Sequence, residues 1–321
     1  MVDGRPVFLI GVDTEADDQW TLEGRKRLSV RNVERLPRLQ GICDRYGVRP
    51  SYLITHEMAT RPESAAVLKD LLAGGRSEVG AHLHPWSSPP YRDEDIAVGR
   101  YPSGLPDDLL ARQMRELTEA IESEIGVRPV SYRAGRHGLD LRGLGHLEAL
   151  RYAVDTSVDP LFNETRLGGP KFPGAPVEPY HPDAGNLLQR GRSAILEVPV
   201  SSATLPRLPK PLEGAYASLH PGRWRGPLKR LGLRPVWLRP SYSPAPDAIA
   251  LAEALVARGV PTLNMLFHSS ELLPGASPYH RDEAAVDRFF DTFERVVDHI
   301  MGHLGAVGLT YAEYAAGRAS G

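Results

Sequence analysis

Short apolar runs alternate with helical stretches along most of this chain. The first run, at 7–12, is continuously apolar, as expected for a strand covered on both faces. Because strands that alternate with helices usually pair in parallel, the pattern predicts an α/β fold. We expect strands at 7–12, 50–55, 77–84, 130–133, 152–157, 194–200 and 261–267, and helices at 30–46, 65–73, 109–125, 141–150, 245–258 and 284–304.

The composition agrees with a single domain over residues 1–321. The hydrophobic content of 41% can bury a sizeable core, and α/β barrels use about 250 residues or more as one domain. The net charge of -2 gives no general reason to expect nucleic acid as a partner. No stretch approaches the roughly 18 apolar residues that a membrane span needs, and the first run is too short for a secretion signal. We therefore expect a cytoplasmic protein, and the single cysteine, Cys43, fits that compartment.

Acidic residues follow the first expected strand directly. Asp13, Glu15, Asp17 and Asp18 occur within six residues. The carboxyl end of a buried strand is where α/β folds place their chemistry. A solvated acidic turn or a helix cap would have the same composition, so both interpretations stay open at this point.

Two histidines two residues apart end the expected strand at 77–84. Side chains at i and i+2 of a strand point to the same face, so His82 and His84 can present both imidazoles to one metal ion. Pro85 then ends the strand, because it has no N–H for a ladder hydrogen bond. Ordinary cleft chemistry is the alternative to a metal site.

Three further strands end in polar residues, at Arg133, Asp155 and His268. An arginine that is followed by glycines suggests a buried cation close to a carboxylate, although a surface loop is the alternative. In a parallel barrel the carboxyl ends of all strands face one mouth. We therefore expect the acids, the histidines and the arginine to converge there.

With these motifs in this order, the chain resembles the polysaccharide deacetylases, which are the NodB-homology enzymes of carbohydrate esterase family 4. The resemblance covers most of the chain and is that of a divergent member. The family motifs are similar to residues 12–15 (VDTE), 78–84 (EVGAHLH), 132–135 (YRAG), the region of Asp155, and 266–269 (LFHS), in that order.

This resemblance implies a distorted (β/α)7-type barrel of parallel strands and a divalent metal, usually zinc. It also implies that Asp13 is the catalytic base, that Arg133 holds this base, and that His268 is the acid that protonates the leaving amine. Asp155 would orient either His268 or Arg133.

The metal ligands depart from the family pattern in two respects. The family usually has two adjacent aspartates in its first motif, whereas here one residue separates Asp13 from Glu15. The family's metal histidines are usually four residues apart, whereas His82 and His84 are two apart. We choose Glu15 as the acidic ligand because it shares a strand face with Asp13, but Asp17 and Asp13 itself remain alternatives.

The resemblance implies a metal-dependent hydrolase that removes an N-acetyl or other acyl group from an amino sugar or a sugar-containing biosynthetic intermediate. The first alternative is a cyclic amide or ureide hydrolase of the same fold. A side branch with that activity has a histidine followed by a tryptophan at the spacing of His82 and Trp86, and it can lack the metal. The second alternative is a carbohydrate-binding protein without catalysis, which would have no need of Asp13, Arg133 and His268 together.

Trp86 and Tyr91 follow the histidines and are expected to bind substrate, with packing as the alternative. The segment 205–240 is a basic, Pro-rich insertion with eight Lys or Arg residues and the single acid Glu213. It is either an arm for an anionic substrate or, as we prefer, a solvated insertion. No nucleic-acid-binding motif is present.

Overall fold

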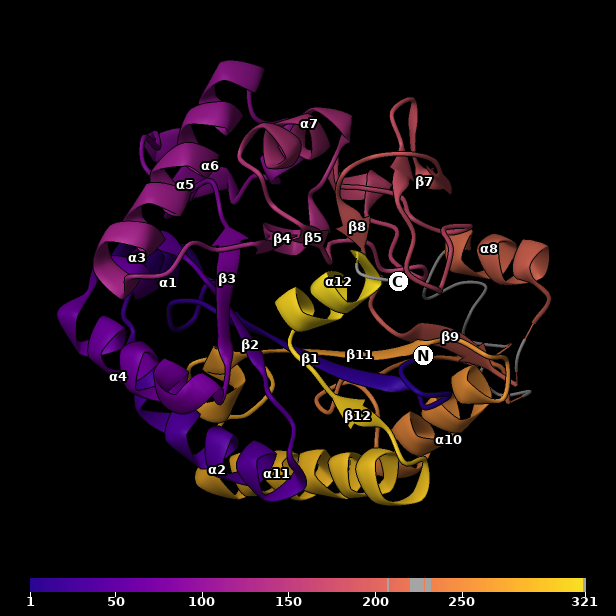
Figure 1. Ribbon diagram of the computed structural model, residues 1–321. Helices are drawn as coiled ribbons and strands as arrows, with labels where there is room; N and C mark the ends of the chain where they lie inside the picture. The colour runs from indigo at the N-terminus through magenta and orange to yellow at the C-terminus, as the bar shows by residue number, and fades with distance from the viewer. Residues whose placement is uncertain (207, 220–227, 229–231, 320–321) are drawn as a thin grey trace.

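The protein is described by a computed structural model that covers residues 1–206, 208–219, 228 and 232–319. Seven parallel strands form one curled sheet in the order β11-β1-β2-β3-β4-β5-β8 (Figure 1). The predicted α/β fold, a distorted barrel of parallel strands, is therefore confirmed. The strands are β1 (Val7–Thr14), β2 (Ser51–Ile54), β3 (Glu78–Leu83), β4 (Ser131–Ala134), β5 (Val154–Asp155), β8 (Leu196–Glu197) and β11 (Thr262–His268); the short β12 (Val307–Gly308) also pairs with β1.

Helices surround the sheet on its outer side (Figure 1). Alternate residues of β1, namely Phe8, Ile10 and Val12, belong to the apolar core between the sheet and these helices. The main helices are α2 (Leu36–Tyr46), α4 (Pro62–Leu72), α6 (Asp107–Ala120), α7 (Leu141–Ala149), α10 (Ala245–Val256) and α11 (Glu283–Asp298), and shorter ones are α1 (Leu22–Arg27), α3 (His56–Thr60), α5 (Asp93–Val98) and α8 (Lys210–Ser218). Helix α5 lies in the stretch 87–106, where the sequence has no helical period.

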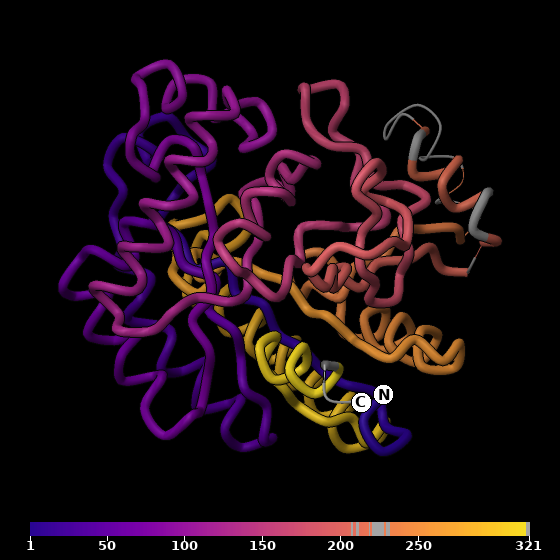
Figure 2. The backbone as a smooth tube through the Cα atoms, turned by 45° about the horizontal axis from the view of Figure 1, so that its top comes forward, coloured from indigo at the N-terminus to yellow at the C-terminus, as the bar shows by residue number. Residues whose placement is uncertain are grey.

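The inner side of the sheet is filled differently at its two ends. Towards the amino ends of the strands, Val7 and Leu9 form a small apolar cluster with Tyr311 and Tyr314 of α12 (Tyr311–Ala319). Figure 2 shows this C-terminal helix beside the N-terminal part of the chain. Towards the carboxyl ends of the strands, the inward residues are polar. The apolar cluster therefore supports the polar site from below.

Strands β8 and β11 form the two edges of the curled sheet, and side-chain and loop contacts bridge the gap between them. The backbone N–H of Ser201 donates to the carbonyl of Asn264 at 3.0 Å. In return, the Asn264 amide donates to the carbonyls of Val198 and Pro199 at 2.9 and 3.1 Å. These bonds hold β11, and with it His268, against the far edge of the sheet.

The segment 205–240 is only partly a surface insertion. Strand β9 (Ser202–Leu205) pairs antiparallel with β10 (Arg234–Trp237), and α8 lies between them in the chain. A second small hairpin joins β6 (Pro182–Asp183) to β7 (Asn186–Arg190). Several basic residues of the insertion lie outside the described residues, namely Arg207, Arg223, Arg225, Lys229 and Arg230. Within the described part of the chain, no helix has both the length and the apolar character needed to cross a membrane.

Candidate active site

Strand β1 directs Asp13 into the barrel, and Gly11 makes room below it. The inward residues of β1 alternate with those of the apolar core, so Gly11 and Asp13 share the inner face. A Cβ atom on Gly11 would lie 2.6 Å from Nη2 of Arg133 and would also collide with the Tyr311 hydroxyl. Glycine is therefore needed at position 11 for the Arg133 guanidinium to cross the barrel.

Arg133 and Asp13 form a buried ion pair, as the sequence indicated. Register pairs His82 with Arg133 on neighbouring strands, and Arg133 Nη1 reaches Asp13 Oδ1 at 2.5 Å. The guanidinium also donates to the Thr156 carbonyl at 3.0 Å and to the Tyr311 hydroxyl at 2.9 Å. Burial opposes ionisation of Asp13, but Arg133, together with His82 and His268, outweighs it and holds the pKa of Asp13 below its usual value.

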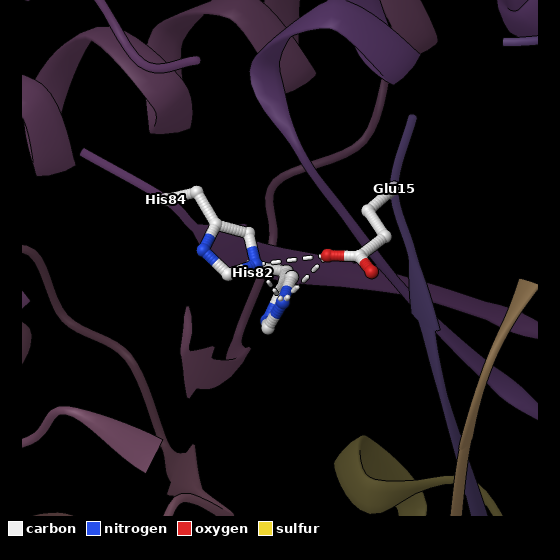
Figure 3. A group of neighbouring side chains, drawn as sticks. All are labelled: Glu15, His82 and His84. Carbon is white, nitrogen blue, oxygen red and sulfur yellow. Dashed lines mark hydrogen bonds and ion pairs between the residues drawn. The ribbon is translucent and has the colours of Figure 1, made fainter. Parts of the chain in front are cut away.

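Three possible metal ligands converge beside this pair (Figure 3). His84 Nε2 lies 2.8 Å from Glu15 Oε2 and 3.1 Å from His82 Nε2, and the three ligand atoms lie within 4.8 Å of one another. Asp17 is not part of this group, because its carboxylate accepts hydrogen bonds from Ser29 and Asn32 instead. The sequence left Glu15, Asp17 and Asp13 as possible acidic ligands, and the structure places Glu15 beside the two histidines.

The geometry of these three residues fits a divalent metal. Two nitrogens bound to one tetrahedral zinc would be about 3.3 Å apart, close to the separation seen for His82 and His84. His82 Nδ1 lies 2.9 Å from the Arg133 carbonyl, to which it donates, so that Nε2 presents its lone pair to the shared point. Metal ligands in proteins are commonly held by such outer hydrogen bonds.

The electrostatics around the histidines also favour a cation. Burial alone would lower the pKa of His82, but the carboxylates of Asp13 and Glu15 raise it above its usual value. Burial lowers the pKa of His84 to about 4, so that its imidazole is neutral and able to bind a metal. The pKa of Glu15 is also lowered, since the neighbouring histidines outweigh its burial. This pocket therefore stabilises positive charge between two ionised acids.

His268 faces the same site from the end of β11. Its Nε2 atom lies 3.9 Å from Asp13 Oδ2, while its Nδ1 atom lies 2.7 Å from Glu271 Oε1. Arg239 Nη2 reaches the same Glu271 oxygen at 2.6 Å, and Ser241 donates to the other oxygen. Burial would raise the pKa of Glu271, but Arg239, together with His268 and Ser241, outweighs burial and holds this pKa below its usual value. Glu271 is thus an ionised carboxylate that orients the His268 ring.

Asp155 does not take the orienting role that the sequence predicted for it. It hydrogen-bonds neither His268 nor Arg133; its carboxylate accepts from the Ser157 backbone N–H at 3.0 Å and from the Ser157 hydroxyl at 2.7 Å. Burial raises its pKa, and burial together with Asp155 raises that of Glu197 well above its usual value. The two acids form a buried pair below the site.

A cavity of about 530 Å³ opens above these groups. Trp86 lines it and stacks on His84, with ring centroids 4.1 Å apart. Tyr91 is 44% exposed and is not among the described residues that line the cavity. The wall also contains aromatic and cationic side chains from connecting segments, namely Trp20, Arg25, Tyr101, Arg136, Phe162, Arg239, Tyr242 and Tyr279.

Sequence reasoning missed Glu271 and Arg239. Glu271 follows His268 by three residues, a spacing that brings two side chains together in a helical turn, and this was the available signal. Arg239 belongs to the segment interpreted as a solvated insertion, yet it is buried and stacks 3.9 Å over the Tyr242 ring. No local pattern marks it as a site residue.

No protein-family model and no curated protein matches this sequence. The fold, however, is similar to those of solved structures. A protein of Mycobacterium smegmatis described as a polysaccharide deacetylase is 15% identical with a TM-score of 0.59, and the alignment covers 100% of this chain and 93% of that chain. A protein of Parabacteroides distasonis described as a glycoside hydrolase/deacetylase is 15% identical with a TM-score of 0.63, and the alignment covers 98% of this chain and 71% of that chain.

The 4-alpha-glucanotransferase of Thermococcus litoralis has the fold as well, at 12% identity and a TM-score of 0.54, with 97% of this chain and 40% of that chain covered. At such identities the likeness concerns the fold. The resemblance to the polysaccharide deacetylases predicted from the sequence is confirmed at that level. One fold hosts many reactions, so the activity has to be argued from the site.

Proposed function

We propose that this protein is a metal-dependent hydrolase that removes an N-acyl group, most simply acetyl, from an amino sugar or a sugar-containing intermediate. The observation that carries the proposal is the convergence of Glu15, His82 and His84 beside the Asp13–Arg133 pair and opposite His268. Base, acid and metal ligands are the parts that hydrolysis of an amide needs.

Glu15, His82 and His84 would hold the metal, for which we propose zinc because two imidazoles and one carboxylate are typical of catalytic zinc sites. Bound there, the metal would polarise the acyl carbonyl and increase the acidity of water.

Asp13 is the proposed general base. Its Oδ1 atom is held by Arg133, which leaves Oδ2 directed towards the histidines, 4.0 Å from His82 Nε2. Since the pKa of Asp13 is lowered, the carboxylate is ionised at neutral pH and able to accept a proton from the attacking water. Arg133 therefore both positions the base and keeps it charged.

His268 is the proposed general acid. Glu271 accepts from Nδ1, so Nε2 is the ring atom that faces Asp13 and the cavity. Protonated Nε2 can give its proton to the nitrogen of the breaking C–N bond, which leaves as an amine. One water is consumed, and the products are a carboxylate and a free amino group.

The aromatic side chains of the cavity support a sugar as the substrate. Trp20, Tyr242 and Tyr279 lie together near His268; the Trp20 ring is 5.3 Å from the His268 ring and 5.6 Å from that of Tyr279. Aromatic walls with a few fixed polar groups are typical of small-molecule sites. We propose that these rings contact the face of the sugar that carries the acylamino group.

Metal content and acetate release test the proposal. The purified protein should contain about one zinc per chain, and His82→Ala and His84→Ala should lose it, whereas the exposed His303→Ala should retain it. The wild type with zinc should release acetate from N-acetylated sugars. Full activity without metal on cyclic amides or ureides would favour the metal-free alternative, and sugar binding without any turnover would favour a binding protein.

A further inference from the structure

Two arginines on the cavity wall have no part in the proposed chemistry. Arg25 and Arg136 both line the cavity, and neither forms an ion pair with a carboxylate of the described residues. They lie close together: burial lowers the pKa of Arg25, and the positive charge of Arg136 lowers it further. Guanidinium groups stay charged in proteins, so the outer cavity carries two neighbouring positive charges.

The guanidinium of Arg136 is held in place by the residues around it. Nη2 donates to the Tyr101 hydroxyl at 2.8 Å, Nη1 donates to the Gly99 carbonyl, and the group stacks 4.0 Å over the Tyr101 ring. Its backbone has φ 53°, a left-handed conformation that is unfavourable for residues other than glycine. A guanidinium has five N–H donors, and two of the five are used here, so others remain for a ligand.

Arg25 is fixed by backbone carbonyls of α5 and of the segment that follows β1. Nε donates to Ile96 at 2.8 Å, Nη2 to Ala97 at 3.2 Å and Nη1 to Gln19 at 3.3 Å. These bonds consume most of its donors, so it contributes mainly charge to the cavity. Arg136 is thus the better placed of the two to form new hydrogen bonds.

One acid, Glu164, also lines this part of the cavity, and no described ion pair joins it to either arginine. A purely structural role, in which the arginines tie the loops around α5 to the barrel, would account for the bonds to carbonyls. It would not account for the unused donors of Arg136 or for two like charges held together. Both are accounted for if an anion completes the site.

We propose that Arg136, with the charge of Arg25 and the hydroxyl of Tyr101, binds an oxyanion of the substrate, either a carboxylate or a phosphate. The substrate would then be an anionic N-acylated sugar, such as a sugar acid or a sugar phosphate. The acylamino group of this substrate rests on the proposed function, whereas its anionic group does not. Planar, bidentate recognition of carboxylate and phosphate is the interaction to which arginine is best suited.

Binding of sugars that cannot be hydrolysed tests the inference. Dissociation constants of glucuronate, glucose 6-phosphate and glucose would be measured by calorimetry with the zinc-loaded wild type. At least one anion should bind about tenfold or more tightly than glucose. This preference should disappear in Arg136→Gln and persist in Arg115→Gln, which removes an exposed arginine of α6. Comparison of glucuronate with glucose 6-phosphate distinguishes a carboxylate site from a phosphate site.

Two outcomes would overturn the inference: no preference in the wild type, or a preference that survives in Arg136→Gln because the anion binds elsewhere. If Arg136→Gln does not fold, as judged by circular dichroism, Arg136→Lys and Tyr101→Phe should each weaken the preference. Acetate release is measured separately with N-acetylglucosamine and its 6-phosphate. Release from the neutral sugar without anion preference refutes only this inference, and an Arg136-dependent preference without any release refutes only the proposed function.

Discussion

The floor and the rim of the cavity are built on different principles. The floor consists of Asp13, Glu15, His82, His84 and Arg133, which are all buried and come from β1, β3 and β4 or directly follow them. Each charge there faces an opposite charge or a donor. Such a site is rigid because strands of a parallel sheet position it.

The rim comes from connecting segments and is partly open to water. Trp20 is 37% exposed and Tyr242 is 48% exposed. Arg25 is held by backbone carbonyls, and Arg136 by a backbone carbonyl and by the hydroxyl and ring of Tyr101. Loops on a fixed scaffold are where binding specificity usually resides. We therefore expect substitutions in the floor to change the reaction rate and substitutions in the rim to change substrate binding.

The largest effect on turnover is expected from His268→Ala. Removal of a general acid costs about 10²–10⁴ in rate, because the leaving amine then departs without a positioned proton donor. Zinc content should stay at the wild-type level, since His268 is outside the ligand group. Acetate release and elemental analysis check both quantities. Equal loss of metal and activity would contradict the acid role.

Arg133→Met should have the largest effect on stability. It leaves the Asp13 carboxylate buried without its cation, and breaking a buried ion pair in this way costs about 3–5 kcal/mol. Urea unfolding measures the change, with the exposed Arg115→Met as a control expected to stay within about 0.5 kcal/mol. If Arg133→Met cost no more than the control, the pair would not be important for the floor.

Glu271→Gln should destabilise the protein in a pH-dependent way, by about 1–3 kcal/mol at neutral pH. The folded pKa of Glu271 lies below the unfolded value of about 4.3, so its ionisation stabilises the fold above that pH. This contribution is lost as the pH falls through the folded pKa. The difference between wild type and variant should therefore shrink as the pH falls from about 5 to about 2, as measured by urea unfolding. A difference that stays constant would show that Glu271 is not ionised.

Trp20→Ala should have the smallest effect of these substitutions, and the effect should be on substrate binding at the rim. Loss of one aromatic contact is worth about 0.5–1.5 kcal/mol, so KM should rise by about two- to tenfold. The value of kcat should change less, because Trp20 touches only the edge of the His268 ring, which Glu271 continues to hold in place. Steady-state acetate release separates the two constants. A fall in kcat at unchanged KM would place Trp20 in the chemistry and remove the distinction between floor and rim.

The sequence by itself was sufficient for the seven strands of the curled sheet and for most of the floor, but not for the two small hairpins. Alternation along a strand is a local property, so the common face of His82 and His84 could be predicted without knowing what lies around them. The same holds for Asp13 and Glu15. The carboxyl ends of parallel strands meet at one edge, which is why Arg133 and His268 could be placed near these residues.

Only the tertiary structure decided which of several equivalent residues takes each role. Asp17 carries a carboxylate as Glu15 does, but hydrogen bonds to the segment at 29–32 turn it away from the histidines. Glu271, rather than Asp155, orients His268, and Arg239 reaches it from a segment that looks solvated in the sequence. Side chains from loops have no period, so their positions depend on packing between distant parts of the chain, which no local pattern records.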